Sequence, residues 1–80
     1  PVGSLVELNT GEIAIVLTHN RTQRLLPSVM IICDAKKEPY LNPVTIDLRS
    51  ADPGPGGVQY AIAKDLPQGA YGIDAKRYYL

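Results

Sequence analysis

The 80-residue chain has no tryptophan or phenylalanine, one methionine, one histidine and one cysteine. Five tyrosines are its only aromatic residues, so the core must consist mainly of Val, Ile and Leu. The lone Cys33 excludes an intrachain disulfide and a cysteine-based zinc site. Its position in the apolar run of residues 29–33 predicts a buried, structural thiol.

The chain also has no excess of charge, since 8 basic and 8 acidic residues give a formal net charge of zero. Proteins that bind nucleic acid usually carry a basic excess, because contacts with phosphates dominate their affinity. Nucleic acid is therefore a disfavoured partner. The apolar runs are too short for a membrane helix and no signal peptide is visible, which predicts no membrane contact and a cytoplasmic location.

A chain of this length predicts one small domain over residues 1–80. Its only methionine is Met30 and it begins at Pro1, so we expect a fragment of a longer, multidomain protein. Short apolar runs on both sides of residues 9–12 predict a β-hairpin. A four-residue loop, with Gly11 at positive φ, would pair Leu8 with Ile13 and place the apolar side chains on one face.

Further short runs predict more strands separated by turns. Residues 29–33 are apolar on both faces, which indicates a central strand. The other expected elements are an edge strand at residues 38–41, strands at 44–48 and 58–63, a flexible loop at 52–57, and a helical turn capped by Asp74. The sequence thus predicts an all-β fold: a small barrel or strongly curved antiparallel sheet of about five strands, with a short C-terminal helical turn.

Side chains that could perform catalysis are sparse. His19 has no carboxylate pair at ligand spacing, the serines have no neighbouring base, and no phosphate-binding glycine motif occurs. We therefore expect no catalytic residues, no metal site and no cofactor. Arg21 and Arg24 share one polar loop and are candidates to hold an anion or phosphate, the alternative being a solvated loop. Lys36 and Lys37 are interpreted as a solvated turn.

The opening segment, PVGSLVELNTGE, resembles the segment that follows the catalytic domain in many bacterial HD-GYP proteins. The similarity extends over nearly the whole chain, through Val16, Asn20, residues 24–27 (RLLP), residues 29–35, Asp47-Leu48, Gly72-Ile73-Asp74 and Tyr78. The family's members are metal-dependent phosphodiesterases that act on cyclic di-GMP. Its catalytic motifs are absent here, since His19 precedes Asn20 and Tyr71 precedes Gly72.

The resemblance therefore implies a non-catalytic accessory domain, whose parent protein is a cyclic di-GMP phosphodiesterase. The implied partner is the catalytic domain of the same polypeptide, with homodimerisation as another role. A second similarity is to nucleotide-binding barrels of the PilZ type. Compared with their motifs, Arg21 and Arg24 are one residue too close together, Ser50 is one residue too far from Asp47, and Pro53 replaces a glycine. A small RNA-contacting β-barrel is a third alternative.

Overall fold

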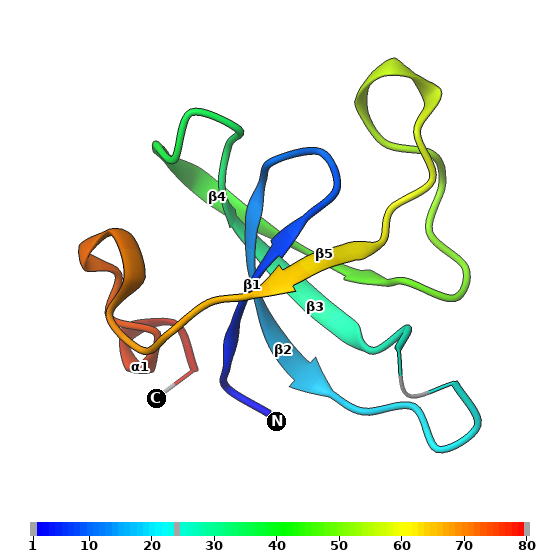
Figure 1. Cartoon of the computed structure of the whole chain (residues 1–80), viewed down its shortest axis with the longest axis horizontal. Helices are drawn as coiled ribbons and strands as arrows, with labels where there is room; N and C mark the ends of the chain where they lie inside the picture. The colour runs from blue at the N-terminus through cyan, green and yellow to red at the C-terminus, as the bar shows by residue number, and fades with distance from the viewer. Residues whose placement is uncertain (1, 24, 80) are drawn as a thin grey trace.

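The computed structural model describes residues 2–23 and 25–79, and of Tyr79 only the backbone. Five strands form one antiparallel sheet in the order β4-β3-β2-β1-β5. The strands are β1 (Leu5–Leu8), β2 (Ile13–Thr18), β3 (Ser28–Cys33), β4 (Pro39–Asp47) and β5 (Ile62–Asp65), followed by the short helix α1 (Lys76–Tyr79). Figure 1 shows the sheet strongly curved, with β5 crossing in front of β3. This confirms the predicted all-β fold.

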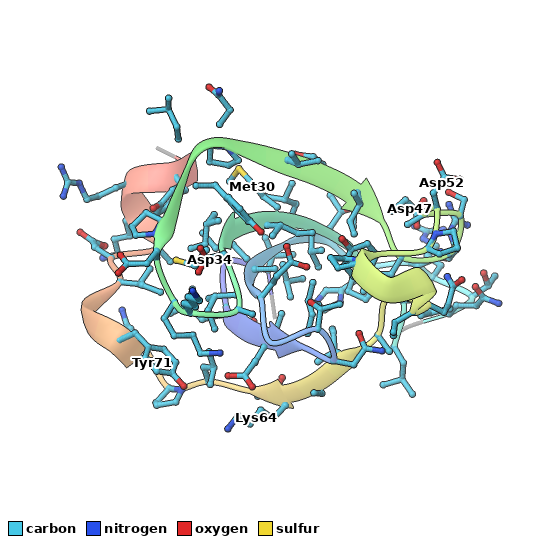
Figure 2. The ribbon with its side chains drawn as sticks, turned by 90° about the horizontal axis from the view of Figure 1, so that it is seen from above. Met30, Asp34, Asp47, Asp52, Lys64 and Tyr71 are labelled. Atoms are coloured by element: carbon cyan, nitrogen blue, oxygen red, sulfur yellow. The ribbon has the colours of Figure 1, made fainter. Side chains whose placement is uncertain are left out.

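The curved sheet packs side chains on both of its faces. One cluster consists of Val6, Leu8, Ala14, Val16, Val29, Ile31 and Leu48, and Tyr60 and Ile62 pack against it. The second cluster consists of Leu5, Ile13, Ile15, Ile32 and Cys33, and the C-terminal segment covers it with Leu66, Ala70, Ile73, Ala75 and Tyr78. Figure 2 shows β4 and β5 on opposite sides of the packed interior. Cys33 is buried as expected.

The register predicted for the first hairpin is wrong by one residue. Leu5 pairs with Ile15 and Glu7 with Ile13, so Leu8 lies opposite Glu12, whose carbonyl oxygen accepts the Leu8 N–H at 2.8 Å. The loop has three residues, with Gly11 at φ 90° as expected, a common hairpin geometry. The prediction assumed one apolar face, whereas both faces of these strands are buried.

The later strands differ from the prediction in their bounds. β3 is central, between β2 and β4, as predicted. Residues 38–41 and 44–48 were expected as separate strands, but β4 runs without a break from Pro39 to Asp47. The bounds of the strand predicted at 58–63 are wrong, because β5 covers Ile62–Asp65 and only residues 62 and 63 of the prediction lie in it. The backbone just before β5 hydrogen-bonds instead to the side chain of Asn9, at the Gln59 oxygen and the Ala61 nitrogen.

The turn residues bond as their types predict. Asp74 Oδ1 accepts the backbone N–H of Lys76 at 3.2 Å, which caps the first turn of α1. Residues 52–57 include a short 3₁₀ turn, Pro55–Gly57, so this loop has local structure.

The interpretation of Lys37 as solvated is wrong. Its Nζ donates to the Gly11 oxygen at 2.7 Å and lies 3.3 Å from Glu7 Oε1.

Candidate functional site

Arg21, one of the two candidates for binding an anion, lies in the loop that follows β2. It lines a cavity of about 280 Å³ together with residues 18–20, Ser28, Asp47 and Arg49; we call this the polar pocket. The Arg21 side chain is exposed and has no hydrogen bond or ion pair within the described residues. The second candidate, Arg24, lies outside the described residues.

Arg49 is a pocket residue that the sequence did not single out. Its guanidinium contacts the Asp47 carboxylate twice, with Nη2 3.0 Å from Oδ2 and Nε 3.4 Å from Oδ1. The backbone N–H of Arg49 also donates to Asp47 Oδ1. These hydrogen bonds lower the pKa of Asp47 and raise that of Arg49. The Asp47-Leu48-Arg49 spacing is a signal for this pair, but not for its proximity to Arg21.

The sheet brings the two arginines together. Thr18 pairs with Ser28 at the end of β2, and Ser28 pairs with Asp47 across β3 and β4. Thr18, Ser28 and Asp47 are thus neighbours on three adjacent strands, and all three line the polar pocket. Figure 2 shows Asp47 and Asp34 on opposite sides of the view, and the β3–β4 ladder runs from the Ser28–Asp47 pair to the Cys33–Pro39 pair. The pocket therefore lies at the other end of this ladder from the β3–β4 turn.

A buried carboxylate is the second feature that the sequence did not predict. Glu12 is 6% exposed, and its Oε2 accepts the Tyr40 hydroxyl at 2.8 Å while its Oε1 accepts the Thr10 hydroxyl at 2.7 Å. The hydrogen bond to Glu12 is the main cause that raises the pKa of Tyr40 to about 12. Burial, followed by the Glu12 charge, raises the pKa of Tyr60. Both carboxylate oxygens of Glu12 therefore accept hydrogen bonds. The bond from Tyr40 links the first hairpin to β4.

An exposed apolar surface follows the edge strand β4. Leu41 is 93% exposed, Val44 55% and Tyr40 39%; we call these three side chains the β4 surface. The strand bulges here, because Ile31 pairs with Val44 and Cys33 with Pro39. Leu41 is one of the inserted residues of this bulge and is the most exposed of the three side chains. These exposed apolar side chains make the edge strand a candidate for contact with another protein surface.

Among residues 2–23 and 25–79, no three His, Cys, Asp or Glu side chains form a group that would bind a metal ion. Within that same part of the chain, helices with the length and apolar character needed to cross a bilayer are absent.

Comparison with known families identifies one match. The family model described as "KOW domain associated with HD domain" matches residues 5–52, which is more than half of the chain and extends from β1 through β4 to the loop beyond. Neither a curated protein nor a solved structure matches the chain significantly. The matched part contains the first hairpin, the β4 surface and the whole polar pocket. The chain belongs to the family of KOW domains that are associated with HD domains.

Proposed function

We propose that this chain is a non-catalytic accessory domain that packs against an HD-GYP-type phosphodiesterase domain of the same polypeptide, in a bacterial cyclic di-GMP signalling protein. The family match supports the association with an HD domain. The similarity of the opening segment to the segment that follows HD-GYP catalytic domains supports the finer assignment. The role of the chain is to position or stabilise the catalytic domain.

The β4 surface is the observation that carries this proposal. Leu41 is 93% exposed and lies on an edge strand beside the half-exposed Val44 and Tyr40. Pro39 and Pro43 lack a backbone N–H, so this edge is poorly suited to adding another strand. Contact through side chains remains, and an apolar surface of this kind matches the apolar core of a domain interface. The occupant is the HD domain.

The experiment replaces one apolar side chain in the full-length protein that contains this chain. Leu41→Asp places a charge on the β4 surface and is expected to lower the Tm of the full-length protein and reduce its turnover of cyclic di-GMP. The control is Leu25→Asp, because Leu25 is 84% exposed in a loop outside the β4 surface. Equal behaviour of the two variants and the parent protein would contradict the proposal.

The non-catalytic part of the proposal needs its own assay. The 80-residue chain, supplied with Mn²⁺ and cyclic di-GMP, is expected to produce no linear dinucleotide, whereas the full-length protein hydrolyses the substrate under the same conditions. Chromatography of the nucleotides distinguishes the two results. Hydrolysis by the chain alone, undiminished by further purification, would overturn this part.

A further inference from the structure

The loop after β2 contains a turn that is closed by hydrogen bonds to one of its own side chains. Asn20 Oδ1 accepts the backbone N–H of Thr22 at 3.2 Å and the Thr22 hydroxyl at 3.1 Å. This turn fixes the backbone on both sides of Arg21. The side-chain amide nitrogen of Asn20 donates no hydrogen bond within the described residues, so it remains available as a donor. The guanidinium of Arg21 has no partner among the described residues.

Arg49 is positioned but only partly used. Its contacts with Asp47 involve Nε and Nη2, and the guanidinium has five N–H donors in total. Nη1 therefore keeps its two hydrogens for another acceptor. The side chain of Arg49 is 48% exposed and that of Asp47 is 31% exposed. The free N–H donors of Arg49 are therefore accessible to an anion from solvent.

The polar pocket combines these donors in one concave site. Arg21 and Arg49 contribute two positive charges and Asp47 one negative charge, which leaves a net positive pocket. The same cavity is also lined by Thr18, His19 and Ser28, which carry two hydroxyl groups and an imidazole. A phosphate group accepts hydrogen bonds on several oxygens and is bound bidentately by arginine. The donor set is therefore suited to a phosphate group.

We propose that the polar pocket binds the phosphate group of a small phosphate ester, held between Arg21 and Arg49. The cavity of about 280 Å³ is just below the roughly 300–1,000 Å³ of sites that enclose whole ligands. The pocket therefore admits the phosphate, and the rest of the ligand extends into solvent. This inference is independent of the contact with an HD domain, because the pocket and the β4 surface share no residue.

The test is an NMR titration of the 80-residue chain with inorganic phosphate. Saturable shifts are expected at the amides of residues 18–21, Ser28 and Arg49. Arg21→Gln and Arg49→Gln should each weaken binding about five- to tenfold, because each removes a charge-assisted contact. Arg77→Gln is the matched control on exposed α1 and should leave binding unchanged. Absent or unsaturated shifts, or equal losses in all three variants, would overturn the proposal.

Asp47→Asn makes the test sharper, since it predicts a gain. The asparagine Oδ1 still accepts the Arg49 backbone N–H, so the turn is kept, while the competing negative charge is removed. Binding of phosphate should tighten about threefold or more. Unchanged phosphate binding in this variant would show that Arg49 contacts Asp47 without contacting phosphate. This result would contradict the proposed role of Arg49 in binding.

Two further arms identify the source of the phosphate. A mononucleotide such as GMP is expected to bind at least as tightly as inorganic phosphate and to shift the same amides. A short single-stranded RNA is expected to bind no more tightly per phosphate, with a shallow salt dependence. If RNA alone binds, and its affinity falls steeply with salt, the pocket is part of a nucleic-acid surface and the proposal is wrong.

Discussion

At the scale of single residues, Glu12 stands out because it is a charged side chain that is buried. A buried carboxylate is costly unless its oxygens are hydrogen-bonded, and here Tyr40 and Thr10 occupy both of them. The sequence placed Glu12 in the hairpin loop, but its partner Tyr40 lies 28 residues away. Local patterns therefore do not identify this pair. The function of Glu12 in the fold is to hold β4 against the first hairpin.

Removing the hydroxyl of Tyr40 tests that role. Tyr40→Phe leaves the buried Glu12 oxygen without its donor, and we expect the free energy of unfolding to fall by about 1–2 kcal/mol in urea denaturation. Tyr71→Phe is the control, because the Tyr71 hydroxyl contacts Glu7 at 3.5 Å on the exposed surface. A control loss as large as that of Tyr40→Phe would contradict a special role for Glu12.

The same hydrogen bond predicts a dependence of stability on alkaline pH. The pKa of Tyr40 rises from 10.0 to about 12 on folding, so between these values the folded state holds a proton that the unfolded state has lost. The contribution of this hydrogen bond to the free energy of unfolding is fully present below pH 10 and is lost as the pH rises toward and through 12. Denaturation curves measured across this range should show the loss, and Tyr40→Phe should show less of it. A flat profile would contradict the shift.

At the scale of elements, the three-residue loop of the first hairpin connects several strands. Asn9 contacts the backbone before β5 through both side-chain atoms, at 2.8 Å and 3.2 Å. Gly11 provides both the positive φ and the carbonyl oxygen that binds Lys37. The loop was expected only to reverse the chain. Its Asn9 side chain also hydrogen-bonds to the backbone of residues 59 and 61, where a strand was predicted.

Asn9→Ala measures what that connection contributes. We expect a loss of about 1–2 kcal/mol, because two hydrogen bonds to the backbone disappear, together with faster hydrogen exchange at Ala61. Asn42→Ala is the matched control, since Asn42 is exposed in the β4 bulge and should change stability by less than about 0.5 kcal/mol. Unchanged exchange at Ala61 would show that β5 is held by β1 alone.

Gly11→Ala tests the close approach at the loop. An added Cβ would lie 3.2 Å from the Ala35 Cβ, on a backbone with φ 90°, and we expect a loss of about 1–3 kcal/mol. Gly69→Ala has a similar φ of 82° with nothing within 4 Å of the added Cβ. It should therefore lose less stability. If Gly69→Ala is equally destabilised, backbone strain alone explains the Gly11 result.

Much of the fold could be predicted from the sequence, because it depends on local signals. Alternation, turn residues and the apolar run at residues 29–33 indicated the strands and the central position of β3. The register failed because β1 and β2 are apolar on both faces, so alternation could not choose between them. Arg21 was identified from its loop, but its neighbour Arg49 was not. Only the pairing of β2, β3 and β4 brings these residues together.

At the scale of the whole molecule, the chain presents two separate surfaces to its surroundings. The polar pocket lies at the end of β2, β3 and β4, and the β4 surface lies along the sheet edge. Membership of the KOW domains associated with HD domains gives the β4 surface its proposed occupant. The pocket gives the domain a separate means of binding phosphate.

Hydrogen–deuterium exchange tests the proposed contact most directly. The amides of Tyr40, Leu41, Asn42, Val44 and Thr45 should exchange at least about tenfold more slowly in the full-length protein than in the 80-residue chain, because the proposed contact with the HD domain covers the β4 surface. The amides of residues 20–23, which lie outside this surface, should exchange at equal rates in both. Equal rates at residues 40–45 would contradict docking through β4.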